Sequence, residues 1–232
     1  MVMVVQSEEA EPVRKAARTR RTEAAAKPDS RDGANRGSRE LWLDAACELL
    51  LDQGVAAVMI QPLSKRLKLS RTSFYWFFED REELLDAVLE RWRDRNTGSI
   101  RERSSAYAET IGEATLNLFD CWLDPELFDT RFEFAVRSWA LQSEEVAAEI
   151  KAADQQRLEA ITAMFTRFGY PLAEADARAR TVYLTQIGYI SMQTVEAPDV
   201  RMPRVAHYVE IFTGKPAQPR ELARFFARHH YS

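Results

Sequence analysis

The sequence predicts an all-α protein, with an N-terminal three-helix helix-turn-helix domain followed by a larger helical domain. Three observations predict this class. Apolar residues recur at three- and four-residue intervals through most of the chain, which is the spacing of a helix face. Beyond residue 105 no stretch alternates apolar and polar residues as a half-buried strand does. Two short helical patterns near residue 68 are joined by a brief turn, as in a helix-turn-helix.

The composition of the 232-residue chain is globular, with 46% hydrophobic and 29% charged residues. Its net charge of −4 argues against a protein that binds polyanions through overall charge, but it does not exclude a local basic surface. Cys47 and Cys121 lie far apart, so we expect two reduced core thiols in a cytoplasmic protein. No apolar run approaches about 18 residues, so no membrane helix is expected. The apolar stretch Met1–Val5 is short and is followed by acidic residues, so no secretory signal is expected either.

Three regions differ in composition. Residues 1–37 are expected to form a disordered arm of basic and acidic residues, because they have almost no large apolar side chains after Val5. Its basic cluster is either a solvated tail or an arm that follows a DNA backbone. Residues 38–95 are expected to form the helix-turn-helix domain, and residues 96–232 the second domain. We place the boundary where the apolar pattern weakens, within 93–105.

The first helix is expected to begin after the N-cap Ser38 and to end at Gly54. Its apolar face is Leu41, Trp42, Ala45, Ala46, Leu49 and Leu50. The second helix is expected from Gln61 to Leu67, because Pro62 is tolerated in a first turn. Lys68 and Leu69 then form the turn.

The third helix is expected to begin after the N-cap Ser70 and to carry five consecutive aromatic residues, 74–78. A short helix cannot bury all five, because its buried stripe covers only part of its circumference. The predicted buried face is Phe74, Phe77 and Phe78, and the outward face is Arg71, Thr72, Tyr75 and Trp76. No acidic residue interrupts 61–78, which carries a local charge of +4. Cations, hydroxyls and amphipathic rings on one face indicate contact with phosphates and base edges.

A fourth helix is expected to follow the N-cap Asp80, with Glu83 in the capping-box position. Its buried stripe is Leu84, Leu85, Val88 and Trp92. The second domain is expected to contain helices at about 105–122, 126–142, 144–168, 172–196, 204–213 and 219–230. Prolines at 198 and 203 bracket an expected loop.

Residues 38–92 resemble the N-terminal domain of the TetR (tetracycline-repressor) family of bacterial transcription regulators. The motifs that carry the resemblance are Ala45-Ala46, Gly54, Leu63 to Leu67, Leu69-Ser70, Tyr75 with Phe78, Arg81-Glu82 and Leu84-Leu85. The resemblance implies that Tyr75 and Arg81 contact phosphates, and that Arg71, Thr72 and Ser73 face base edges. It also implies a homodimer, a double-stranded DNA operator and a small-molecule effector, without a cofactor.

Several residues depart from the family pattern. Thr72 stands where the family has a small residue, and Trp76 where it usually has His. Lys68 replaces a turn Gly, which strains a left-handed position but adds a cation. Met59 and Ile60 replace a capping hydroxyl, so the start of the second helix is expected to be less stable, or Gln61 to contact a phosphate instead.

The predicted DNA-binding set is Gln61, Lys65, Lys68, Ser70, Arg71, Thr72, Ser73, Tyr75, Trp76 and Arg81. Two alternatives stay open. Tyr75 and Trp76 can be packing residues against the second domain, and the cations of 65–68 can be a solvated patch.

The second domain is expected to dimerise, because one helix-turn-helix reads too few base pairs to be specific. The predicted seam is Leu158, Ile161, Phe165, Phe168, Ile187, Gly188 and Ser191. The predicted ligand-binding residues are Phe119, Trp122, Phe134, Arg137, Trp139, Phe165 and Tyr183. Either set can instead be intrachain core. For Arg137, a structural ion pair with Asp154 or Glu133 is favoured over an anionic ligand.

No motif supports an enzyme or a metal site. His207 stands alone and His229-His230 are adjacent, so the spacing of metal ligands is absent, as are phosphate-binding loops and nucleophile elbows. The sequence therefore predicts a ligand-responsive, dimeric DNA-binding regulator, most simply a repressor released from a pseudo-palindromic operator by an effector. The alternative is a helical interaction or small-molecule-carrier protein whose helix-turn-helix docks protein.

Overall fold

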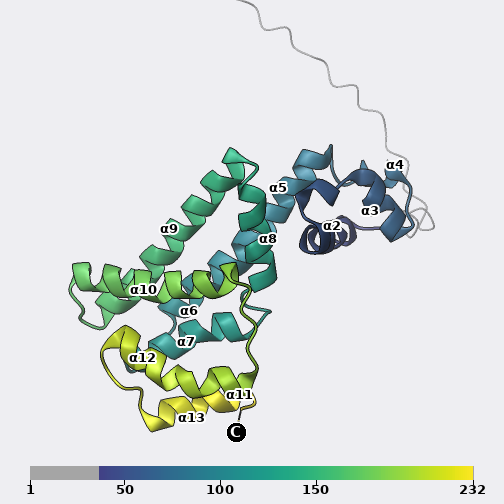
Figure 1. The fold of residues 1–232 in the computed structure, drawn as a ribbon. Coiled ribbons are helices and arrows are strands. Elements are labelled where there is room, and N and C mark those ends of the chain that lie inside the picture. Colours follow the sequence, from purple (N-terminus) through teal and green to yellow (C-terminus); the bar gives the residue numbers. More distant parts are fainter. Residues whose placement is uncertain (1–36, 232) are drawn as a thin grey trace, which may run out of the picture.

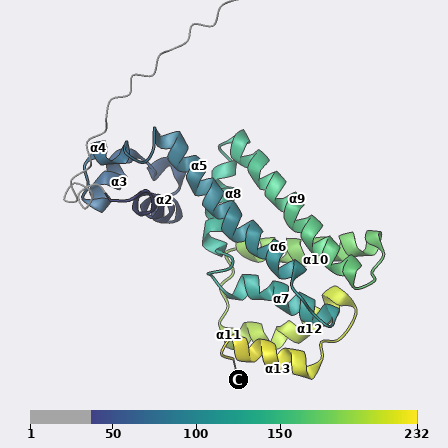
Figure 2. The same ribbon diagram turned by 180° about the vertical axis from the view of Figure 1, so that it is seen from behind.

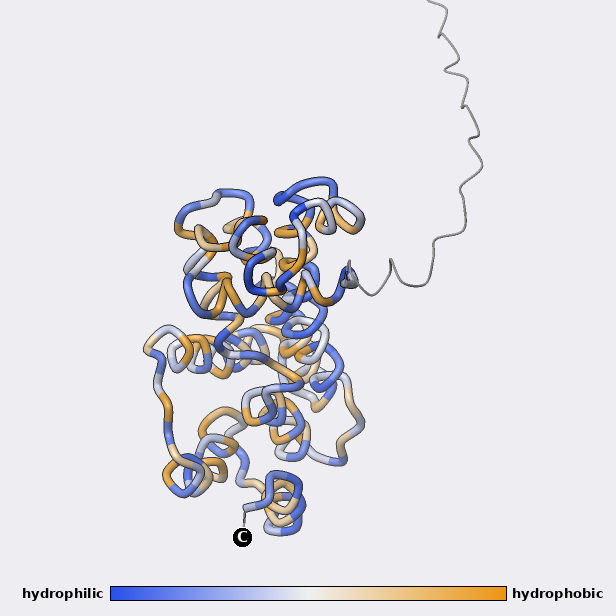
Figure 3. Tube along the Cα trace, turned by 90° about the vertical axis from the view of Figure 1, so that its right-hand side faces the viewer, coloured by the Kyte–Doolittle hydropathy of each residue, from blue (hydrophilic) through white to orange (hydrophobic). Residues whose placement is uncertain are grey.

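A computed structural model describes residues 37–231, and every regular element in that range is helical, which confirms the all-α prediction. Apart from Gly37, the predicted arm 1–37 lies outside the described residues. The helix-turn-helix domain lies at one end of the molecule and the larger helical domain at the other (Figure 1). Along the helical trace, hydrophobic (orange) and hydrophilic (blue) stretches alternate (Figure 3). No helix of the described range has the length and hydropathy needed to cross a bilayer.

The N-terminal domain consists of four helices and one 3₁₀ turn. They are α2 (Arg39–Gln53), η1 (Val55–Ala57), α3 (Ile60–Leu67), α4 (Arg71–Phe74) and α5 (Arg81–Trp92). The caps explain these bounds. The Ser38 hydroxyl accepts from the Leu41 amide at 3.1 Å, and the Asp80 carboxylate accepts from the Glu83 amide at 2.9 Å. Gly54 ends α2 at φ 81°, a region that favours glycine.

The cap of α5 differs from the sequence prediction, whereas the start of α3 agrees with it. The Glu83 carboxylate accepts from the Glu79 amide, not from that of Asp80, so the expected capping box is shifted by one residue. Met59 precedes α3 without a side-chain hydrogen bond to the helix, as its apolar side chain requires. The start of α3 therefore lacks the stabilisation that Ser38 gives to α2.

No loop separates α5 from the second domain. A π-helical turn (Arg93–Thr97) joins α5 to α6 (Gly98–Ser105), and the helices follow one line in Figure 2. The helix expected at 105–122 begins only at Ile111. The sequence pattern is weak here because three of the four buried positions of 93–105 are polar: Asn96, Thr97 and Ser104 are at most 2% exposed, and only Ile100 is apolar. Apolar periodicity cannot detect a helix that buries polar side chains.

Beyond α6, the larger domain is built on four longer helices and short C-terminal elements. They are α7 (Ile111–Leu123), α8 (Thr130–Ala140), α9 (Glu144–Arg167), α10 (Leu172–Ser191), α11 (Pro198–Arg201), η3 (Met202–Arg204), α12 (Val205–Thr213) and α13 (Pro219–Arg228). The expected loop between the prolines at 198 and 203 is therefore helical, because proline is accepted in a first helical turn.

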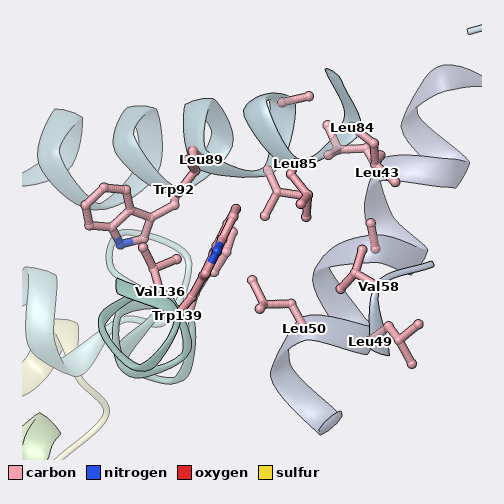
Figure 4. Close-up of a cluster of buried hydrophobic side chains, with 14 of the residues drawn as sticks. Leu43, Leu49, Leu50, Val58, Leu84, Leu85, Leu89, Trp92, Val136 and Trp139 are labelled. Carbon is pink, nitrogen blue, oxygen red and sulfur yellow. The ribbon is translucent and has the colours of Figure 1, made fainter. Parts of the chain in front are cut away.

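The hydrophobic core of the N-terminal domain extends into the second domain. Leu50 of α2 and Leu85, Leu89 and Trp92 of α5 pack in one cluster with Val136 and Trp139 of α8 (Figure 4). A second cluster lies within the larger domain and includes Ile161, Phe165 and Val209. Because α8 packs on both α2 and α5, a movement of α8 displaces side chains of the N-terminal domain.

Both cysteines are free thiols, as predicted. Cys121 is fully buried and Cys47 is partly buried. Burial raises the pKa of Cys47 to about 11 and that of Cys121 to about 12. Both side chains are therefore protonated at neutral pH and behave as small apolar residues.

Candidate nucleic-acid interface and ligand cavity

The recognition helix α4 is a single α-helical turn that ends at Phe74, so the other four aromatic residues expected on it lie beyond its end, with residues 75–77 in a turn. The Ser70 hydroxyl caps α4 by accepting from the Ser73 amide at 3.2 Å. Phe74 is fully buried and packs edge-on against Trp42, with ring centroids 5.4 Å apart. Tyr75 and Trp76 face outward, 58% and 62% exposed. The division into a buried and an outward face thus follows the sequence pattern.

The cations near this helix fall into two groups. Lys65, Lys68 and Arg71 are exposed, and no carboxylate of the described residues lies within 4 Å of them. Arg66 instead donates to Glu48 at 2.7 Å, on the side of α2. The exposed members of the predicted set are Gln61, Lys65, Lys68, Ser70, Arg71, Thr72, Tyr75 and Trp76. They surround α4 with cations, hydroxyls and rings that a phosphate or a base edge can reach.

Two members of the predicted set are placed differently. Ser73 is only 4% exposed, and its hydroxyl lies 2.9 Å from that of Ser70, so it supports the helix cap and cannot face a base edge. Arg81 donates from Nε to the Val58 carbonyl at 2.7 Å and from Nη2 to the Val55 carbonyl at 3.1 Å. Its guanidinium group therefore ties the start of α5 to the turn after α2, a role that no sequence motif indicates.

Lys68 ends α3 in the left-handed region, at φ 56° and ψ 35°. A side chain with a Cβ is strained there, whereas glycine is not. The strain anticipated from the sequence is thus present in the backbone. The same geometry leaves the ammonium group exposed beside α4.

A cavity of about 620 Å³ lies between the N-terminal domain and the larger domain. Leu50, Leu51, Gly54 and Val55 form its wall on the α2 side, and Phe134 and Trp139 of α8 line it as well. Most of its remaining wall comes from α10 and the segment that follows. The volume lies in the range of small-molecule sites, about 300–1,000 Å³.

A second, narrow cavity of about 50 Å³ lies between α7, α10 and α12. Four residues line both cavities: Trp122, Gln186, Tyr189 and Arg201. Of the predicted ligand-binding residues, Phe119, Trp122, Phe134 and Trp139 line one cavity or both. Arg137, Phe165 and Tyr183 line neither, because Phe165 is buried in the core and the other two belong to a polar network.

The predicted ion pair of Arg137 is present. Arg137 donates from Nε to Glu133 at 2.9 Å and from Nη1 to Asp154 at 3.2 Å. The hydroxyl of Tyr183 donates to the same Asp154 at 2.6 Å and accepts from Arg137 at 3.1 Å. The structural ion pair, without an anionic ligand, therefore accounts for the burial of Arg137.

The centre of this network is a second arginine that sequence reasoning missed. Arg157 and Glu133 are both fully buried, and Arg157 Nη1 donates to Glu133 at 2.7 Å. Arg157 Nε donates to Thr97 at 2.9 Å, and the guanidinium carbon lies 5.1 Å from the Trp92 ring centroid. The periodic pattern of α9 gave no signal, because a buried cation occupies a position where the pattern expects an apolar residue.

Glu133 connects the polar network to α5 and to the π-helical turn. Its Oε2 accepts from the Trp92 indole at 2.8 Å and from the Asn96 amide at 2.9 Å. Burial alone would raise the pKa of Glu133, but the charges and hydrogen bonds of Arg157 and Arg137 hold that pKa below its ordinary value. A buried carboxylate thus bridges the π-helical turn to α8 and α9. Such turns are frequent at functional sites.

Part of the predicted dimer seam on α9 lies in the core of the chain. Ile161 and Phe165 are fully buried within the chain, and Leu158 and Phe168, which are half-buried, pack against the same core. Helix α9 packs on α10 and α6, which accounts for the helical spacing of these residues. On α10, Ile187 packs on the core, whereas Ser191 is exposed and Gly188 half-buried.

Comparison with known proteins identifies relatives of the N-terminal domain. Residues 43–88 match the family model of the bacterial regulatory proteins of the tetR family. Over 74 residues the chain is 32% identical to the tetracycline repressor protein class G of Vibrio anguillarum. That match covers 32% of this chain and spans about a third, 35%, of the curated relative's length.

Solved structures share the fold over most of the chain. A transcriptional regulator from Rhodococcus sp. Rha1 has a TM-score of 0.56 at 15% identity, covering 83% of this chain and 97% of that one. A transcriptional regulator from Aquifex aeolicus VF5 has a TM-score of 0.54 at 16% identity, covering 77% and 96%. Residues 43–88 therefore carry a domain of the bacterial regulatory proteins of the tetR family, and this domain includes the recognition helix.

Proposed function

We propose that the protein is a dimeric, ligand-responsive DNA-binding transcription regulator, acting as a repressor that its effector releases from a pseudo-palindromic operator. The observation that carries this proposal is the exposed face around α4. It presents Arg71, Tyr75 and Trp76, with Lys65 and Lys68 beside them and no acidic residue from 61 to 78. Cations provide the salt-dependent affinity for phosphates, and side chains at the start of a recognition helix read base edges.

The outward face of α10 is the surface that best fits a second copy. Its apolar Leu184 is 57% exposed, and four residues along the same side of the helix are small. These residues are Ala177, Thr181, Gly188 and Ser191. Small side chains at three- and four-residue spacing let two helices approach closely. Ile211 of α12, 67% exposed, adds apolar area on a neighbouring helix.

Leu184→Glu is expected to weaken the dimer at least about tenfold, because a carboxylate would be buried between two copies. Sedimentation analysis over a concentration series measures this. Leu141→Glu is the matched control, because Leu141 is 87% exposed and lies after α8. A dimer unchanged by Leu184→Glu would contradict the proposed surface.

The cavity of 620 Å³ supports the proposed ligand response. An occupant would touch α8 and Val55 at once, and Val55 is held by Arg81 at the start of α5. A ligand that binds better to one spacing of these elements shifts the population toward that spacing. Operator half-sites require recognition helices about 34–36 Å apart, or a related spacing. An effector that favours another separation therefore lowers operator affinity, and the operator lowers effector affinity equally.

The first experiment measures binding of the purified protein to DNA flanking its own gene and to scrambled DNA, at low and moderate salt. We expect preference for the flanking DNA and an affinity that falls steeply with salt, because counterions are released from phosphates. A protein that docks other proteins through its aromatic face would show no such salt dependence. Equal, weak binding to both DNAs would count against the proposal.

Lys68→Gly is expected to have opposite effects on stability and on DNA binding. The free energy of unfolding should rise by about 1 kcal/mol, because glycine removes the left-handed strain. Operator affinity should fall, with a salt slope smaller by about 1.8 per dimer, since each lost phosphate contact removes roughly 0.9. Urea unfolding and salt-dependent titrations measure the two effects. Lys65→Gln, in the right-handed helix, should lose affinity without gaining stability.

A further inference from the structure

Arg201 is a cation without an anionic partner at the junction of the two cavities. It is the last residue of α11 and lines both cavities. Its guanidinium carbon lies 5.8 Å from the Tyr189 ring centroid. Within residues 37–231, no carboxylate lies within 4 Å of it. Burial lowers the pKa of Arg201, so the side chain has lost part of its hydration without gaining an ion pair.

A second unsatisfied donor lines the same space. Trp122 is only 7% exposed, and its indole nitrogen is buried with no hydrogen-bond partner in the described part of the chain. Gln186, also 7% exposed, lines both cavities beside it. Buried N–H groups are nearly always paired in folded proteins. An acceptor that binds at this junction would satisfy Arg201 and Trp122 together.

The other charges of the cavities offset Arg201 only in part: burial lowers the pKa of Arg201 by more than the Glu196 carboxylate raises it. Arg201 is the one charged residue among those lining the narrow cavity. In the larger cavity Glu196 is paired with Arg204, and Arg131 points to solvent with a 71% exposed side chain. The aromatic walls would also attract a cation, but the charge of Arg201 opposes one. Glu196 Oε2 is buried without a partner and can accept from a neutral N–H of the same ligand.

We infer that the effector is a carboxylate with a flat or linear apolar body. Its carboxylate binds the Arg201 guanidinium group and the Trp122 indole, and its body lies in the 620 Å³ cavity against Phe134 and Trp139. Arginine binds carboxylates through two parallel hydrogen bonds, which suits an orienting anchor. The body then reaches Leu50 and Val55, the wall formed by the DNA-binding domain. This inference rests on the proposed ligand response and names its chemical class.

Calorimetric titration of the full chain with matched compounds tests the class directly. The probes are benzoate, 2-naphthoate and dodecanoate, each beside its primary amide and the corresponding amine. We expect saturable binding of one or more acids, with their amides and amines at least about tenfold weaker, as expected for loss of a charged hydrogen bond. Arg201→Gln should reduce acid affinity by about tenfold or more, and Trp122→Phe by a smaller factor. Arg131→Gln is the matched control and should keep wild-type affinity.

The outcomes separate the ligand class from the proposed function. No saturable binding of any acid up to millimolar concentration overturns the inference, as does equal binding of acids and amides, or acid binding that Arg201→Gln leaves unchanged. Unfolding curves of each variant verify that it is folded. Operator titrations with and without the tightest acid then test the function alone. An acid that binds through Arg201 but leaves operator affinity unchanged supports the ligand class and contradicts the effector role.

Discussion

Replacing Glu133 with Gln should lower the free energy of unfolding by about 3–5 kcal/mol, the range for breaking a buried ion pair. The amide keeps the size of the side chain but removes the charge that faces Arg157 at 2.7 Å and Arg137 at 2.9 Å. Arg157 is fully buried, so it cannot recover hydration from water. Urea unfolding followed by circular dichroism measures the loss.

The double variant Glu133→Gln with Arg157→Gln separates the charge effect from loss of packing. It should be more stable than Glu133→Gln alone, because no unpaired cation remains at the centre of the network. A double variant whose loss equals the sum of the two single losses would show that the pair is not coupled. Asp154→Asn is the matched control. Because the Asp154 side chain is partly exposed, this variant should lower the free energy of unfolding by less than Glu133→Gln does.

Lowering the pH should also weaken the ion pair between Glu133 and Arg157. The folded-state pKa of Glu133 lies below its unfolded value, so its contribution to stability is complete above the unfolded pKa, ordinarily about 4.3. That contribution is lost as the pH falls below this value and through the folded-state pKa. Unfolding free energies should therefore decrease more steeply with acid in the wild type than in Glu133→Gln.

For the proposed ligand response, the network would connect the cavity walls to the DNA-binding domain. Glu133 lies on α8, whose other face supplies Phe134 and Trp139 to the cavity. The Trp92 indole, which donates to Glu133, lies at the end of α5. A ligand that moves α8 must either carry Trp92 with it or break this hydrogen bond. This coupling is a physical connection between two elements, and its size is open to measurement by double-mutant cycles.

Local patterns predicted the features that local chemistry determines. Ser38, Ser70 and Asp80 are N-caps because a short side-chain oxygen reaches the first free amides of the helix that follows. The split of the aromatic run into buried Phe74 and exposed Tyr75 follows from helical periodicity. Such features depend on neighbours three or four residues away, and a single sequence contains them.

Features that depend on distant partners were not predictable in the same way. Arg81 is a candidate phosphate ligand in the sequence, yet its partners are backbone carbonyls 23 and 26 residues earlier. Arg157 reaches Thr97, 60 residues away. Periodicity predicts that the apolar face of α9 is buried, but it does not predict which element covers that face. Only the packing of α9 on α10 and α6 decides this.

Arg71→Ala should weaken operator binding and also relax its base preference. A side chain that reads a base edge contributes about 1–3 kcal/mol of discrimination, and a dimer presents two copies. Tyr75→Ala should weaken binding to operator and scrambled DNA alike, because a phosphate contact carries no sequence information. Titration of both DNAs at several salt concentrations distinguishes the two effects.

Arg66→Ala is the internal control for this face. It removes an equal charge five residues before Arg71, but that charge is already paired with Glu48 on α2. Operator affinity should therefore change little in Arg66→Ala. In Arg71→Ala it should fall strongly, because that variant removes an exposed cation. If Arg66→Ala weakened binding and both Arg71→Ala and Tyr75→Ala did not, the DNA-contacting face would lie on the α2 side of α3. The exposed ring of Tyr75 and the +4 charge of 61–78 would then need another partner.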